Sequence, residues 1–174
     1  MKNILAILGS LRAKSTNLTI LENIADRFGD KINLTIYGDL ANLPHFNPDL
    51  DTETPPEAVA DLRRRIGAAD GVLICAPEYV FSAPAALKNA LEWTVSSSDF
   101  HDKPTALITA SSLGEKAHES LTLILKTIDA RVGEHAALLI SHAQTKIRNG
   151  KISDSETIES LTLLIESFLN TIER

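Results

Sequence analysis

Short apolar runs alternate with longer amphipathic stretches along this chain. Four runs of five or six mostly apolar residues have the length expected of strands, and they cover residues 4–8, 71–76, 105–110 and 136–140. The runs over residues 4–8 and 71–76 are typical of strands that are buried on both faces. A fifth segment, residues 32–36, alternates between apolar and polar side chains, which is typical of a strand with one exposed face. We therefore expect five strands, the second of them at a sheet edge.

The segments between these strands have apolar residues at helical spacing. This spacing predicts helices over residues 17–28, 57–69 and 84–95, and within 115–132. A polar segment with an Asn149-Gly150 turn signal precedes a last helix. The apolar face of that helix is made by Ile158, Leu161, Leu164, Ile165, Phe168, Leu169 and Ile172. Residues 39–56 contain four prolines and are predicted to form a loop.

Five strand–helix repeats predict a parallel α/β sheet with helices on both faces. A flavodoxin-like and a Rossmann-like strand order both fit this alternation. Five strands with the second at an edge favour the flavodoxin-like doubly wound sheet, order 2-1-3-4-5. The length fits a single domain over residues 1–174. Ligands of such sheets bind at the carboxyl ends of the strands, so we expect the chemistry in loops 9–17, 77–82 and 111–114.

Composition excludes several classes of partner. The net charge is −6, from 17 basic and 23 acidic residues, which argues against nucleic acid. The one basic cluster, Arg63-Arg64-Arg65, is interpreted as a solvated helix face. No apolar run approaches the ~20 residues that span a membrane, and the first run is too short for a signal peptide. A single cysteine, Cys75, and five scattered histidines argue against a disulfide framework and a metal site. We expect a cytoplasmic protein whose only cysteine is an inert core thiol.

The first of these loops concentrates hydrogen-bond donors between a buried strand and a helix start. It lacks the glycines of a dinucleotide fingerprint and of a Walker A loop. Free backbone N–H groups and the helix dipole favour an anion there, and Arg12 could bind a phosphate. The alternative is that Ser15, Thr16 or Asn17 only caps the helix. Because capping explains one donor and not the whole set, we favour the anion site.

The second loop places Tyr79 and Phe81 at the carboxyl end of a strand, where they could line a pocket for a flat ring. On the residues alone, the opposite interpretation is slightly favoured: the aromatic side chains lie in the core and Glu78 is solvated. No arrangement of serine, histidine and aspartate predicts a catalytic triad.

Three motifs taken together resemble the NADPH-dependent FMN reductase family, which includes flavin-dependent quinone, azo-dye and chromate reductases. The motifs are Gly9-Ser10-x-Arg12-x-x-Ser15-x-Asn17, Pro77-Glu78-Tyr79 and Pro84-x-x-Leu87-Lys88-Asn89-Ala90-x-x-Trp93. The first two lie ~60 residues apart, as a βαβαβ unit requires. The resemblance covers at least residues 1–110.

This resemblance implies a flavodoxin-like fold that binds FMN. NADPH or NADH would pass a hydride to the flavin, and a quinone, flavin or similar small-molecule acceptor would then take two electrons. The cofactor performs this chemistry, so no catalytic residue is obligatory. Members commonly form dimers or tetramers, which implies a homodimer or homotetramer with the flavin site near a subunit interface.

The resemblance also implies a set of cofactor-binding residues. The phosphate would be held by Ser10, Arg12, Ser15, Thr16, Asn17 and Leu18. The edge of the isoalloxazine would be held, largely by backbone, by Pro77, Glu78, Tyr79 and Val80. Ser111, Ser112 and Gly114 would lie over or beside the ring.

Two departures from the family pattern keep other functions open. The family usually has Asn where this chain has Val80, which removes a polar side chain near the flavin. The segment after the fourth strand is short and poor in glycine, which weakens the case for nicotinamide or acceptor binding. The alternatives are a non-enzymatic flavodoxin-like electron carrier and a flavin-free α/β binding module.

Overall fold

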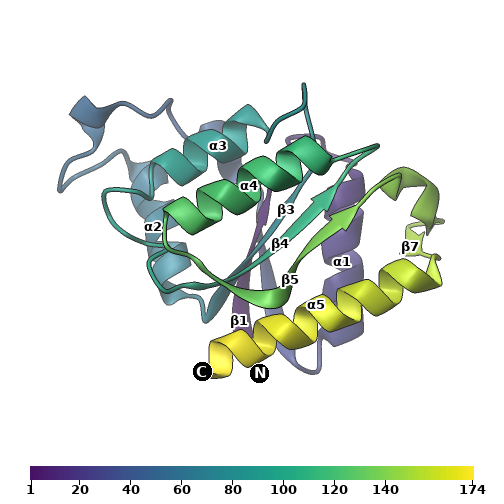
Figure 1. The fold of residues 1–174 in the computed structure, drawn as a ribbon. Coiled ribbons are helices and arrows are strands. Elements are labelled where there is room, and N and C mark those ends of the chain that lie inside the picture. The colour runs from purple at the N-terminus through teal and green to yellow at the C-terminus, as the bar shows by residue number, and fades with distance from the viewer.

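A computed structural model describes residues 1–174. Its centre is a parallel sheet of five strands in the order β2-β1-β3-β4-β5 (Figure 1). The strands are β1 (Lys2–Leu8), β2 (Ile32–Tyr37), β3 (Gly71–Ala76), β4 (Pro104–Ala110) and β5 (Arg131–Ile140). The predicted flavodoxin-like order and the edge position of β2 are both confirmed.

Helices cover both faces of the sheet (Figure 1). One face carries α1 (Thr16–Phe28) and α5 (Ser155–Glu173). The other carries α2 (Glu57–Ala68), α3 (Ala85–Glu92) and α4 (Glu115–Thr127). Successive residues of a strand point to opposite faces, so Ile4 and Leu5 belong to different cores. None of the helices combines the length and apolarity needed to cross a bilayer.

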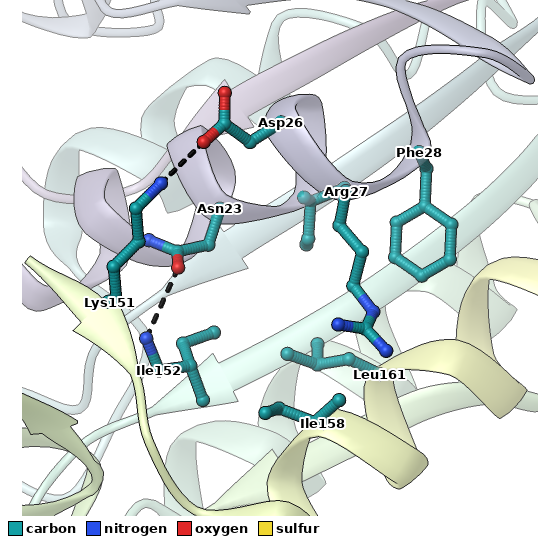
Figure 2. A pocket seen from close by; sticks show the side chains of 9 residues that line it. Asn23, Asp26, Arg27, Phe28, Lys151, Ile152, Ile158 and Leu161 are labelled. Carbon is teal, nitrogen blue, oxygen red and sulfur yellow. Dashed lines mark hydrogen bonds and ion pairs between the residues drawn. The ribbon is translucent and has the colours of Figure 1, made fainter.

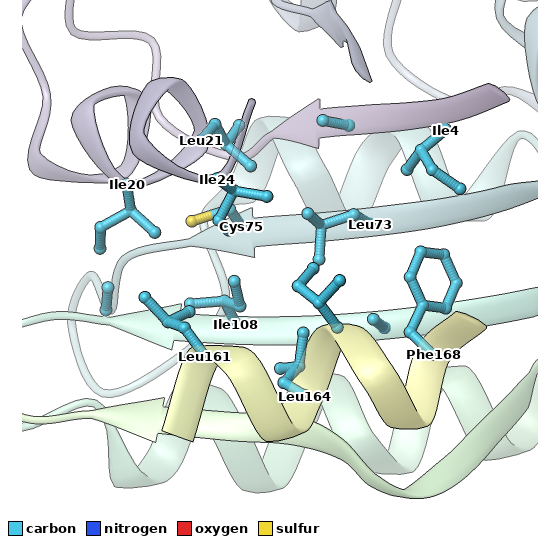
Figure 3. Close-up of a cluster of buried hydrophobic side chains, with 14 of the residues drawn as sticks. Ile4, Ile20, Leu21, Ile24, Leu73, Cys75, Ile108, Leu161, Leu164 and Phe168 are labelled. Atoms are coloured by element: carbon cyan, nitrogen blue, oxygen red, sulfur yellow. The ribbon is translucent and has the colours of Figure 1, made fainter. Parts of the chain in front are cut away.

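The core between α1, α5 and the sheet contains the only cysteine. Figure 3 shows Cys75 among side chains that include Ile24, Leu73 and Ile108. Its Sγ lies 3.3 Å from Oδ1 of Asn17. Complete burial raises the pKa of the thiol far above its ordinary value. Cys75 is therefore protonated at neutral pH, in keeping with the inert core thiol that the sequence predicts.

Several element boundaries differ from the predicted ones. β5 begins five residues before position 136, and its pairing with β4 shifts register between Thr105 and Leu107. The early part of β5 has no clear apolar pattern because it lies at the sheet edge, where Glu134 and His135 are exposed. Gly133 lies close to α5, since a Cβ there would be 2.5 Å from Oγ1 of Thr171. The helix α3 ends at Glu92, earlier than predicted. The long loop contains two short 3₁₀ turns, η1 (Asp39–Asn42) and η2 (Pro48–Leu50).

The Asn149-Gly150 turn is confirmed. It joins β6 (Ile147–Arg148) to β7 (Lys151–Ile152), and both turn residues have positive φ. Figure 2 shows how α1 holds this hairpin across a cavity of about 300 Å³. Asn23 donates to the carbonyl of Gly150 and accepts from the N–H of Ile152, while Lys151 pairs with Asp26. Directly after the hairpin, the N–H of Ser153 donates at 2.9 Å to the carbonyl of Lys146, the last residue of the 3₁₀ turn η3 (Ala143–Lys146).

The prediction that the whole Arg63-Arg64-Arg65 cluster is solvated is wrong for Arg63. Its side chain is only 13% exposed, and Nη2 lies 2.7 Å from Oδ1 of Asp51. Its Nε donates to the carbonyl of Trp93 at 2.9 Å. Arg63 therefore ties α2 to the long loop and to the end of α3. Arg64 and Arg65 are exposed and pair with Asp61 on their own helix.

Candidate functional site

The loops after β1, β3, β4 and β5 surround a cavity of about 310 Å³ at the carboxyl ends of the strands. It lies where the strand order reverses, as the fold predicts. Ten of the thirteen predicted site residues line this cavity: Ser10, Arg12, Ser15, Thr16, Asn17, Pro77, Glu78, Tyr79, Ser111 and Ser112. The structure thus brings all three predicted loops together.

The first loop presents free donors at the N-terminus of α1. Oγ of Ser15 accepts from the N–H of Leu18 at 3.0 Å, so Ser15 caps the helix. The backbone N–H groups of Thr16 and Asn17 have no partner within the protein, and neither does the guanidinium of Arg12. These unpartnered donors and the positive end of the helix dipole suit an anion. Capping and anion binding are therefore compatible properties of this loop.

The side chain of Asn17 has a different task. It is 2% exposed, and its Nδ2 donates to the carbonyl of Ala110 at 3.2 Å. Its Oδ1 lies within reach of the Cys75 thiol. The amide thus joins α1 to β3 and β4, which leaves only the backbone N–H of Asn17 for a ligand.

The second loop is a two-residue hairpin turn. Tyr79 and Ser82 exchange backbone hydrogen bonds of 3.0 Å, and between them Val80 and Phe81 have φ of 49° and 53°. Val80 is 95% exposed and Phe81 is 72% exposed. The interpretation that the aromatic side chains of this loop are core is therefore wrong. The Tyr79 hydroxyl lies 3.5 Å from Oγ of Ser10, at the cavity.

Glu78 is only partly solvated, which differs from the same interpretation. It is half-buried, and its Oε2 accepts a hydrogen bond of 2.9 Å from the backbone N–H of Ala117. Ala117 lies in the first turn of α4, which begins at the end of the third loop. One side chain thus connects the second loop to the third.

Three of the predicted site residues do not line the cavity. Leu18, in the first turn of α1, packs against the core under that helix, and Val80 lies at the tip of its turn. Gly114 precedes α4 with a φ of 97°, and a Cβ there would lie 2.8 Å from Cδ1 of Leu139. Glycine is therefore needed at this position for its backbone conformation and for the space.

A fourth wall was missed by sequence reasoning. It is formed by residues around η3, namely His142, Ala143, Gln144 and Thr145, together with Ala110. The N–H groups of His142 and Ala143 donate to the carbonyls of Ser112 and Ser111 at 2.9 and 3.0 Å. The available signal was the strand order itself, because β5 lies beside β4 and its following loop must end beside Ser111.

The charges around the cavity favour an anion near α1. Arg12 is its only arginine or lysine, and Glu78 its only carboxylate. The Glu78 carboxylate faces the N-terminus of α4, whereas Arg12 has no counter-ion. The part of the cavity formed by Arg12 and the N-terminus of α1 is positive, and it lies beside the loop that carries Tyr79. This arrangement suits a ligand with both a phosphate and a flat ring.

A doubly wound sheet with this site defines a class of mononucleotide-binding α/β proteins. The chain belongs to the NADPH-dependent FMN reductase family, whose model matches residues 2–145. Proteins of this family are oxidoreductases that use FMN with NAD(P)H as electron donor.

Similar proteins span the whole chain. It is 31% identical to the NADH-dependent flavin reductase subunit 2 of Lactobacillus johnsonii, with 98% of this chain and 97% of that protein covered. It is 30% identical to a quinone reductase of Escherichia coli strain K12, with 98% and 95% covered. Among solved structures, FerB of Paracoccus denitrificans, a flavoenzyme NAD(P)H:(acceptor) oxidoreductase, matches with a TM-score of 0.80 and 26% identity, covering 99% of this chain and 98% of FerB.

Proposed function

We propose that residues 1–174 act as one FMN-binding domain that reduces a quinone or a free flavin at the cavity described above. The observation that carries this proposal is the set of unpartnered donors at the start of α1: the N–H groups of Thr16 and Asn17 and the guanidinium of Arg12. These donors fit the phosphate of FMN in number and charge.

The remaining walls fit the other parts of the cofactor. Pro77, Glu78 and Tyr79 follow the switch-point strand β3 and would hold the edge of the ring. Ser111 and Ser112 would lie beside it. Ser10 stands between the two regions, since its Oγ accepts from the N–H of Arg12 and lies near the Tyr79 hydroxyl.

The protein's part in the reaction is binding and orientation. Bound FMN supplies the chemistry that accepts a hydride and releases two electrons. Arg12 and the N-terminus of α1 would hold the phosphate and so orient the cofactor. The loops around Tyr79 and Ser111 would exclude water from the ring, and the nicotinamide and then the acceptor would use the same place beside it.

The proposed acceptor class rests on the relatives, which are named as flavin and quinone reductases. The exposed Val80 and Phe81 beside the cavity support a homodimer or homotetramer with the site near the subunit interface. Use of NAD(P)H and a single, protonated cysteine favour the cytoplasm.

An anaerobic titration tests the proposed function. The purified chain, loaded with FMN, is mixed with NADPH or NADH, and the visible flavin absorption is followed before and after a quinone is added. We expect the absorption to disappear with the nicotinamide and to return with the quinone. Binding of FMN without bleaching by either nicotinamide would indicate an electron carrier instead. A chain that fails to bind FMN would indicate a flavin-free binding module.

A further inference from the structure

The start of α4 lacks a capping side chain of its own. Ser15 caps α1 and Asp154 caps α5, but the residue before α4 is Gly114. The first hydrogen bond within α4 runs from the N–H of His118 to the carbonyl of Gly114. The N–H groups of the preceding turn therefore need acceptors from elsewhere.

Glu78 supplies one of these acceptors from a distant part of the chain. It lies 39 residues earlier, in the loop after β3, and its Oε2 is 2.9 Å from the N–H of Ala117. The carboxylate also lies at the positive end of a 13-residue helix, where negative charge is stabilised. The contact thus resembles an N-cap made across two neighbouring loops.

Both loops joined by this contact line the same cavity. Pro77 and Tyr79 flank Glu78 on one side, and Ser111 and Ser112 precede α4 on the other. Other polar contacts between the walls join different loops: Oγ of Ser10 lies near the Tyr79 hydroxyl, and the N–H groups of His142 and Ala143 donate to the carbonyls of Ser112 and Ser111. Between the second loop and the start of α4, the Glu78 carboxylate makes the only hydrogen bond.

We propose that Glu78 is a positioning residue: through Ala117 it holds the two loops at the spacing that the flavin ring requires. This inference rests on the proposed function and extends it, because Glu78 then acts on the cofactor through α4. If the ring binds only when the contact is formed, FMN binding and the Glu78–Ala117 hydrogen bond stabilise each other by the same factor.

Three variants separate this role from loss of charge and from general damage. Glu78→Ala removes the acceptor, and Glu78→Gln keeps an acceptor oxygen without the charge. Glu115→Ala is the matched control, because Glu115 is an exposed carboxylate in the same first turn of α4 with no hydrogen-bond partner. The readouts are FMN affinity by fluorescence and hydrogen exchange at Ala117, with and without FMN.

We expect Glu78→Ala to weaken FMN binding about fivefold, equivalent to about 1 kcal/mol, and to speed exchange at Ala117. Glu78→Gln should restore most of the affinity, and Glu115→Ala should leave affinity within twofold of the wild type. In the wild type, FMN should slow exchange at Ala117 by a similar factor, and Glu78→Ala should abolish that slowing.

Two results would overturn the inference while the proposed function stands. One is wild-type FMN affinity in Glu78→Ala despite faster exchange at Ala117, and the other is equal weakening by Glu78→Ala and Glu115→Ala. Failure of the wild-type chain to bind FMN would refute the proposed function itself, and the positioning role with it.

Discussion

At the scale of single residues, Arg12 is the cationic side chain best placed to distinguish FMN from riboflavin. The two flavins differ only in the phosphate, and the guanidinium lines the cavity without an ion-pair partner. A charge-assisted hydrogen bond is worth about 1.5–3 kcal/mol, so Arg12→Ala should weaken FMN binding roughly ten- to hundredfold. Riboflavin binding should hardly change.

Titration of both flavins into wild type and variant measures this difference. Lys14→Ala is the control, because Lys14 is an exposed cation of the same loop that does not line the cavity. Equal losses for FMN and riboflavin would show that the loop had been damaged. Unchanged FMN affinity would show that the backbone N–H groups hold the phosphate without Arg12.

The burial of Cys75 predicts a dependence of stability on alkaline pH. Burial raises the pKa of the folded thiol, whereas the thiol of the unfolded chain titrates near its ordinary pKa of 9.0. Above that pH the unfolded state loses a proton that the folded state keeps, so the free energy of unfolding falls by about 1.4 kcal/mol per pH unit. Below pH 9, Cys75 is protonated in both states and does not make the free energy of unfolding depend on pH.

Urea denaturation between pH 7 and pH 10 tests this expectation on wild type and Cys75→Ala. Removing the thiol will lower stability at every pH by loss of packing, so the informative quantity is the slope above pH 9. We expect a steeper fall in the wild type. Parallel curves for the two proteins would contradict the assignment of a protonated buried thiol.

At the scale of elements, the Tyr79–Ser82 turn uses residues that are poorly suited to its conformation. Two-residue hairpins with positive φ at both central positions favour Asn and Gly, and a β-branched residue at φ 49° is strained. Val80→Asn should therefore raise the free energy of unfolding by about 1 kcal/mol. Because Val80 does not line the cavity, we expect this gain in stability and little change in FMN affinity.

Denaturation of the FMN-free protein measures the gain. Val95→Asn is a suitable control, since Val95 is also an exposed valine but lacks a positive φ. If Val95→Asn stabilised the protein as much as Val80→Asn did, relief of backbone strain would not be the cause.

The elements also show how far the sequence determines the site. The spacing of apolar residues and the length of the apolar runs were enough to predict all five strands and the loops that meet at their carboxyl ends. This works because the burial of a strand depends largely on its own residues. The contacts between loops were not accessible in this way. The contact of Glu78 with α4 and the position of residues 142–145 beside Ser111 have no signature in the neighbouring sequence. Both depend on how separate segments pack.

At the scale of the whole molecule, the apolar tip beside the cavity predicts self-association. Val80 and Phe81 project into solvent at the edge of the site, and a buried aromatic anchor commonly contributes about 2 kcal/mol or more to an interface. Phe81→Ser should therefore weaken a dimer at least roughly tenfold. Sedimentation of wild type and variant over a range of concentrations measures the change.

Leu163→Ser provides the matched control, because Leu163 is an exposed apolar side chain on α5, away from the cavity. Should both variants associate like the wild type, the Val80–Phe81 tip would not form the interface. A wild-type chain that remained monomeric would contradict the prediction outright.

Asn89 and Trp93 belong to the motif that carries the family resemblance, yet they contact no part of the cavity. Asn89 bonds the backbone of Pro44 and Phe46, and the Trp93 indole donates to the same Pro44 carbonyl. These two residues of the motif therefore anchor the long loop after β2, and their presence does not indicate catalytic activity. Asn89 and Trp93 would serve the same purpose in a protein of this fold without a flavin, so genome surveys that assign reductase activity should examine the donors around Arg12 first.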